Sequence, residues 1–145
     1  MQRKNKGFSL IELLIVVAII LIIAAIAIPN LLRSRIAANE ASAVQSMRTL
    51  TTVQNTYNST YGIGYSPSLL SLGPPAAPPP SPAGADLIDS VFAAGTKSGY
   101  IFTYTPSAAV GGIIYNYVLN ADPVTPGTTG QRHFYTDQSG VIRAN

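Results

Sequence analysis

An unbroken apolar segment occupies the N-terminal part of the chain. Between Phe8 and Ile28 the only polar side chains are those of Ser9 and Glu12. A helix of this length spans about 31 Å at 1.5 Å per residue, which matches a bilayer hydrocarbon core about 30 Å thick. Because apolar residues cover every face, the pattern predicts a helix surrounded on all sides by lipid or by other copies of itself.

The pattern becomes amphipathic after Pro29. Apolar residues now recur mostly at three- or four-residue steps, whereas charged residues such as Glu40 fall largely on the other faces. The apolar positions are Ile36, Val44, Met47, Leu50, Val53, Tyr57 and Tyr61. We therefore predict one helix from about Leu10 to about Tyr57, bent or interrupted at Pro29, whose ring removes an N–H and crowds the preceding turn.

The remaining residues predict a small head. A loop rich in proline and glycine occupies residues 62–85 and is expected at the surface. A short helix should follow, with Asp86 as its N-cap and Gly95 at its C-terminal end. Alternating segments at 100–105, 113–121, 132–136 and 141–143 predict an antiparallel β-meander. Since its apolar face needs a partner, we expect the second half of the long helix to cover it in an α+β fold.

Positive charge is concentrated ahead of the apolar segment. The formal net charge is +3, with nine Lys and Arg against six Asp and Glu. Three of the nine are Arg3, Lys4 and Lys6, so the chain from Phe8 onward carries six of each sign and has no general attraction for nucleic acid. The three leading cations favour a cytoplasmic N-terminus, although Arg33 and Arg35 on the other side weaken the contrast.

Composition and spacing argue against catalysis and metal binding. The chain has no cysteine and one histidine, which excludes disulfides and thiolate metal sites. His133, Asp137 and Ser139 have the residue types of a hydrolase triad, but turn formation accounts for Asp137 and Ser139. The four aspartates, Asp86, Asp89, Asp122 and Asp137, lack the alternating spacing of a calcium-binding loop. We predict no enzymatic activity, no cofactor and no metal.

A specific arrangement surrounds the start of the apolar segment. A short basic leader ends at Gly7, Phe8 follows, Glu12 is the fifth residue from Phe8, and Pro29 lies near the end of the segment. This arrangement resembles the N-terminus of type IV pilins and of the related pseudopilins of type II secretion, most strongly over about residues 6–45. The resemblance implies cleavage between Gly7 and Phe8 by a prepilin peptidase, N-methylation of Phe8, and a type IV pilin-like fold.

The resemblance also implies an organisation and a function. The parts would be a leader at 1–7, a transmembrane and polymerisation helix at 8–28, an amphipathic helix at 29–61 and a head at 62–145. The protein would be a single-pass inner-membrane precursor with a cytoplasmic N-terminus. Inner-membrane machinery would assemble it into a homopolymeric filament at the cell surface. A pseudopilin of a type II secretion system is the alternative, and a DNA-binding minor pilin is less favoured because the head is not basic.

Glu12 has two interpretations that the sequence leaves open. An acid in a membrane segment is costly and needs compensation. The resemblance implies that the new amine of Phe8 on a neighbouring subunit supplies it and thereby selects one axial stagger. Alternatively, Ser9 and Glu12 have the spacing of a capping box that satisfies the helix start. The two roles are compatible if they belong to different stages.

Two further alternatives concern the end of the apolar segment. Ala25 and Ala27 form the small-x-small pattern of a secretory signal cut after Ala27, but the segment exceeds the usual length of about 7 to 15 residues and contains Glu12. Pro29 either kinks the helix or, as the resemblance implies for assembled filaments, marks a melted or stretched region over about residues 24–30.

Overall fold

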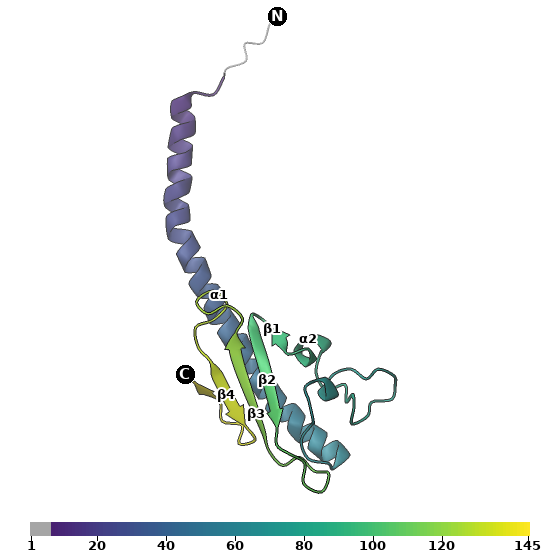
Figure 1. Ribbon diagram of the computed structural model, residues 1–145. Coiled ribbons are helices and arrows are strands. Elements are labelled where there is room, and N and C mark those ends of the chain that lie inside the picture. Colours follow the sequence, from purple (N-terminus) through teal and green to yellow (C-terminus); the bar gives the residue numbers. More distant parts are fainter. Residues whose placement is uncertain (1–6) are drawn as a thin grey trace, which may run out of the picture. The chain divides into compact units, whose positions relative to one another are not determined.

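The structure is a computed structural model and describes residues 7–145. The predicted leader at 1–7, apart from Gly7, therefore lies outside the described residues. The elements, most of them labelled in Figure 1, are α1 (Leu10–Tyr61), η1 (Leu70–Leu72), α2 (Ser90–Ala93), β1 (Thr96–Lys97), β2 (Tyr100–Pro106), β3 (Tyr117–Pro123), β4 (Phe134–Asp137) and β5 (Arg143–Ala144). The chain divides into two compact units, one ending at Arg35 and the other comprising residues 36–145.

The long helix begins at Leu10, as predicted, and ends at Tyr61, four residues beyond the predicted end. The helix is not interrupted at Pro29, which lies inside it. Proline has no N–H to donate to the carbonyl four residues earlier, so the carbonyl of Ala25 loses its usual helical partner. The helix therefore continues through Pro29 with one backbone hydrogen bond fewer.

The sheet is the predicted antiparallel meander, with strand order β1-β2-β3-β4-β5. Its centre is the pair β2 and β3, in which Tyr100 lies opposite Pro123 and Pro106 opposite Tyr117 (Figure 1). Strand β3 begins at Tyr117, later than predicted, because the preceding residues form a separate turn. That turn is closed by an isolated bridge between Val110 and Ile113, around two glycines with positive φ.

The short helix begins at Ser90, so the prediction of Asp86 as its N-cap is wrong. Asp86 has a φ of 54°, and the N–H groups of Leu87 and Ile88 both donate to the carbonyl of Leu72, at 2.8 and 3.1 Å. These contacts attach the segment to η1 instead of starting a helix. The N-cap is Asp89, whose carboxylate accepts a hydrogen bond from the N–H of Phe92 at 2.8 Å.

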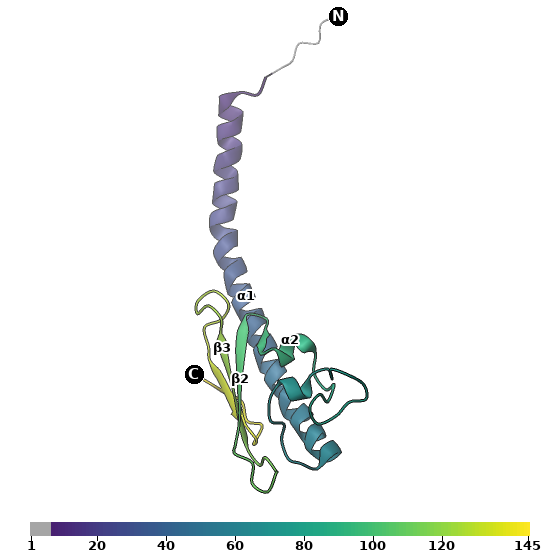
Figure 2. The same cartoon turned by 45° about the vertical axis from the view of Figure 1, so that its right-hand side comes forward.

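A single apolar core holds the second unit together. The strands lie along residues 36–61 of α1 in Figure 2, and side chains of both contribute to one buried cluster. Met47, Leu50 and Tyr57 of the helix are fully buried, as is Leu119 of β3. The α+β fold is therefore a long N-terminal helix packed through its second half on a small antiparallel sheet.

Glu40 is buried, contrary to its predicted place on a polar face. One carboxylate oxygen accepts from the backbone N–H groups of Gln131 and Arg132, at 3.0 and 3.2 Å. The other accepts from the Arg132 guanidinium at 2.7 Å. Burial alone would raise the pKa of Glu40, but these donors and the guanidinium charge outweigh it and lower the pKa below its usual value. Glu40 therefore anchors the loop between β3 and β4 to α1.

Candidate processing and assembly segment

The bond between Gly7 and Phe8 lies ahead of α1, outside any helix or strand. The Phe8 side chain is 82% exposed. A Cβ added at Gly7 would meet nothing within 4 Å. Exposed backbone that is free of regular secondary structure is the usual substrate for proteolysis. The bond at which the sequence predicts cleavage is thus accessible in the described chain.

The start of α1 is capped by its own side chains. The hydroxyl of Ser9 accepts from the N–H of Ile11 at 3.3 Å, and a carboxylate oxygen of Glu12, Oε2, accepts from the N–H of Ser9 at 3.0 Å. This is a capping box, one of the two interpretations of Glu12, in which two N–H groups near the helix start find partners. Within the described residues, no hydrogen bond reaches the second carboxylate oxygen, Oε1. Glu12 thus retains an acceptor after it has capped the helix.

Apolar side chains cover all faces of the first unit. The large ones from Phe8 to Leu32 are between 40% and 82% exposed, and none of residues 7–35 is buried. Among the described residues there is one helix long and apolar enough to cross a membrane, and its apolar window lies near the N-terminus. Exposure of this much apolar surface to water is unfavourable by about 25 cal/mol per Å². The segment therefore requires a surrounding that the described residues do not supply.

The head does not assemble the residues of a hydrolase triad. His133 pairs with Asp122, with Nδ1 to Oδ1 at 2.7 Å, whereas Asp137 accepts hydrogen bonds from the N–H and hydroxyl of Ser139. These Ser139 contacts lower the pKa of Asp137 below its usual value. Asp137 and Ser139 instead form the turn that the sequence predicted.

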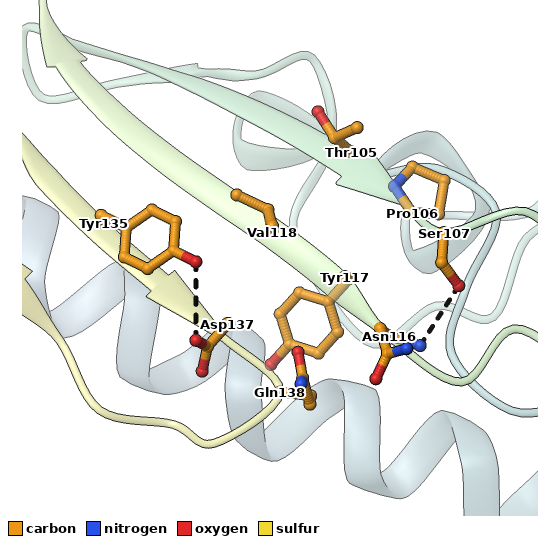
Figure 3. A pocket seen from close by; sticks show the side chains of 9 residues that line it. All are labelled: Thr105, Pro106, Ser107, Asn116, Tyr117, Val118, Tyr135, Asp137 and Gln138. Atoms are coloured by element: carbon orange, nitrogen blue, oxygen red, sulfur yellow. Dashed lines mark hydrogen bonds between the residues drawn. The ribbon is translucent and has the colours of Figure 1, made fainter.

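A hollow of about 310 Å³ lies at one end of strands β2, β3 and β4. Figure 3 shows its lining, with the Tyr135 hydroxyl directed toward the carboxylate of Asp137 and the Tyr117 ring beside Gln138. This lining has an acid but no paired base or nucleophile. Across residues 7–145, no group of three or more His, Cys, Asp or Glu side chains is placed to hold a metal ion.

Comparison with known proteins accounts for the N-terminal segment. A family model described as the prokaryotic N-terminal methylation motif matches residues 2–28. The chain thus carries a prepilin-type N-terminal methylation motif. The matched range includes Gly7, Phe8 and Glu12 and ends one residue before Pro29.

Two curated relatives extend the similarity of this chain beyond the motif. It is 42% identical over 80 residues to the type IV wide pilus major component PilA4 of Thermus thermophilus, covering 53% of this chain and 60% of that protein. It is 46% identical over 54 residues to the type IV major pilin protein PilA of Myxococcus xanthus, covering 37% of this chain and 24% of that protein. The matches thus span less than two thirds of either relative. No solved structure matches the chain significantly.

Sequence reasoning missed the buried polar residues of the second unit. Glu40 resembled a solvated charge because its partners lie 91 and 92 residues later. Gln54 is fully buried, and its amide exchanges two hydrogen bonds with Ser66, at 2.8 and 2.9 Å. One signal for Gln54 was available, since it directly follows Val53 on the face that Leu50 and Tyr57 define.

Proposed function

We propose that the chain is a structural subunit of a type IV pilus-like extracellular filament. The observation that carries this proposal is a helical segment with exposed apolar side chains on every face and a single acid at its start. Such a segment is stabilised in lipid and also among identical segments, because both exclude water. The two relatives, both named as type IV pilus components, support the same assignment.

The proposed life of the protein has two stages. As a precursor it is anchored in the inner membrane by residues 8–28, with the leader at 1–7 in the cytoplasm. A prepilin peptidase then cuts between Gly7 and Phe8 and methylates Phe8. Assembly machinery transfers the helix from lipid into the filament, where residues 8–28 form the core and residues 62–145 the outer surface, with residues 29–61 between them.

Glu12 changes partner between the two stages in this proposal. In the precursor the nitrogen of Phe8 belongs to a peptide bond, so it carries no charge, and Glu12 serves as a helix cap. Cleavage creates a cationic amine at Phe8. In a dry filament core this amine, supplied by a neighbouring subunit, compensates the carboxylate and selects one axial register. The Oε1 atom is available for this contact without loss of the cap.

Pro29 has a proposed role in the filament. The missing hydrogen bond to the carbonyl of Ala25 weakens the preceding turn of α1. We place the loosening of the helix on assembly at residues 24–30. Hydrogen exchange of assembled filaments should therefore be faster there than in residues 10–23.

The test is the identity of the N-terminus in assembled material. The full chain is expressed in a piliated host that lacks its own major pilin, and sheared surface filaments are analysed by intact mass and N-terminal sequencing. We expect a start at Phe8 with one added methyl group. A start at Ile28 would identify a secretory signal and contradict the proposal, and protein confined to the periplasm would favour the pseudopilin alternative.

A Gly7→Val variant provides the matched control. Since a Cβ at this position meets nothing within 4 Å, the described structure does not oppose the substitution. We expect the variant to remain in the membrane at full precursor mass and to form no filaments. Normal processing of Gly7→Val would show that cleavage does not depend on this residue.

A further inference from the structure

Two arginines follow the apolar segment closely and form no ion pair with an acid of residues 7–145. Arg33 and Arg35 are both exposed, and the sequence contains no acid between Glu12 and Glu40. Glu40 is already engaged by Arg132. No salt bridge of the described residues includes Arg33 or Arg35. Their two positive charges are therefore open to an anion from outside the chain.

The Lys and Arg side chains beyond α1, in contrast, each have an acidic partner. Lys97 lies 2.8 Å from Asp89, Arg132 lies 2.7 Å from Glu40, and Arg143 lies 3.5 Å from Asp137. Uncompensated positive charge in the described residues is thus confined to α1, at Arg33, Arg35 and, farther along, Arg48. The first two stand directly after the bilayer-length apolar segment, where a lipid surface would meet them.

A shallow groove joins one of these arginines to the apolar segment. Its volume is about 250 Å³, and it is lined by Ile28, Leu31, Leu32 and Arg35. Residues three, four and seven apart share one helix face, so the groove is an apolar trough with a guanidinium at its end. Arg33 points about 200° around the helix from Arg35, at 100° per residue, and so faces the opposite side.

We propose that Arg35, with Ile28, Leu31 and Leu32, forms a binding site for an anionic phospholipid, and that Arg33 provides a second phosphate contact on the opposite side of the helix. The guanidinium fork binds phosphate oxygens in pairs, and the trough accommodates the adjoining acyl chain. This inference rests on the membrane-bound stage of the proposed function.

The spacing along the helix supports this assignment. If residues 8–28 fill the hydrocarbon core, Arg33 and Arg35 lie about 8 to 10 Å beyond it at 1.5 Å per residue, which is the level of the lipid head groups. Their long side chains can therefore reach the phosphates directly. The site would hold the precursor at a fixed depth and be vacated when the helix enters a filament.

Fluorescence quenching by brominated lipids tests the site in the full chain. The protein has no tryptophan, so a Leu21→Trp substitution gives a single emitter. Leu21 lies seven residues before Ile28, on the same helix face, and is exposed. The chain is reconstituted in mixed vesicles of phosphatidylglycerol and phosphatidylcholine, in which one lipid at a time carries bromine on its acyl chains.

We expect brominated phosphatidylglycerol to quench more strongly, with a relative affinity of about fivefold for each arginine at low salt. The double variant Arg33→Gln, Arg35→Gln should reduce this preference to near one, and Arg35→Gln alone should reduce it more than Arg33→Gln. Arg48→Gln, thirteen residues beyond Arg35, should retain the full preference and serves as the matched control.

Three outcomes would overturn the inference. Equal quenching by both lipids in the parent chain would show that the segment sits in the bilayer without selecting an anionic lipid, and it would leave the proposed function intact. An equal loss in Arg48→Gln would show that net charge alone produces the preference. Absence of quenching by either lipid would place the helix outside the bilayer and remove the membrane stage of the proposed function as well.

Discussion

The two halves of α1 differ in how many of their residues the chain buries. From Leu10 to Arg35 the helix is the more apolar, yet none of its residues is buried within the chain, whereas from Ile36 to Tyr61 nine residues are buried. Apolarity therefore does not predict which residues this chain buries by itself. The second half meets a sheet with a complementary apolar face, and the first half has no such partner among the described residues.

The polar residues of the two regions differ in the same way. In the described chain no buried side-chain nitrogen or oxygen lacks a hydrogen-bond partner, and Glu40 and Gln54 have theirs inside the head. Glu12, the single acid of the apolar half, is only partly satisfied, by one hydrogen bond from Ser9. Internal partners specify one folded head, whereas a partner outside the chain can specify the register of an assembly.

Removal of the Glu12 charge should have the largest effect. In Glu12→Gln the side-chain oxygen can still accept from the N–H of Ser9, so the cap is retained while the charge is lost. We expect normal insertion of the precursor in the membrane and a loss of filament yield of about tenfold or more, because an attraction of about 1.4 kcal/mol already gives a factor of ten. Filaments sheared from equal cell masses are quantified by immunoblot.

The converse variant, Ser9→Ala, removes the hydroxyl that caps Ile11 but keeps the Glu12 charge. Its filament yield should stay within about twofold of the parent, because loss of an exposed cap destabilises a helix by only about 1 kcal/mol. If Ser9→Ala abolished filaments and Glu12→Gln did not, the capping role of Glu12 would be its principal one.

Truncation of a core leucine should separate the two halves of α1 by stability. Leu50 is fully buried, so Leu50→Ala should lower the free energy of unfolding of the head by about 2 to 5 kcal/mol. Leu21→Ala removes the same atoms from an exposed site and should change it by less than about 0.5 kcal/mol. Urea unfolding of the full chain in detergent, followed by near-ultraviolet circular dichroism, measures both. Equal losses of stability in Leu50→Ala and Leu21→Ala would show that the two halves of α1 do not differ in their contribution to the stability of the chain.

Loss of the Glu40 charge should have a smaller effect on the head. Glu40→Gln weakens hydrogen bonds to the backbone of Gln131 and Arg132, and we expect a loss of about 1 to 3 kcal/mol in the free energy of unfolding. Arg48→Gln, which removes an exposed charge outside any ion pair of the described chain, should lie within about 0.5 kcal/mol of the parent. The same urea titrations distinguish the two.

The stability difference between the parent chain and Glu40→Gln should decrease as the pH is lowered. The folded-state pKa of Glu40 lies below its usual value, whereas an unfolded glutamate titrates at about 4.3. The stabilisation is therefore complete above the unfolded pKa and is lost as the pH falls through the folded pKa. The difference between the parent and Glu40→Gln should be full at pH 7 and shrink at pH 3. A constant difference would show that the Glu40 charge does not contribute.

The accuracy of the sequence predictions followed the range of the interactions involved. The apolar segment, the start of α1 at Leu10 and the meander order depend on local periodicity, and the structure confirms them. The burial of Glu40 depends on a loop more than ninety residues away, which no local pattern contains. The two-residue strand β1 was missed because its pairing with Tyr100 and Ile101 depends on a turn that is too short to give a pattern.

Removal of the N-cap of α2 should have the smallest effect on stability. Asp89→Ala removes the hydrogen bond to the N–H of Phe92 and should lower the free energy of unfolding of the head by about 1 kcal/mol. Asp89→Asn keeps a capping oxygen and should lose less, because the exposed ion pair with Lys97 contributes at most about 1 kcal/mol. Asp86→Gly should be nearly neutral, since glycine accepts the positive φ of this position. A larger loss of stability in Asp86→Gly than in Asp89→Ala would indicate that Asp86 caps the helix, as the sequence predicted.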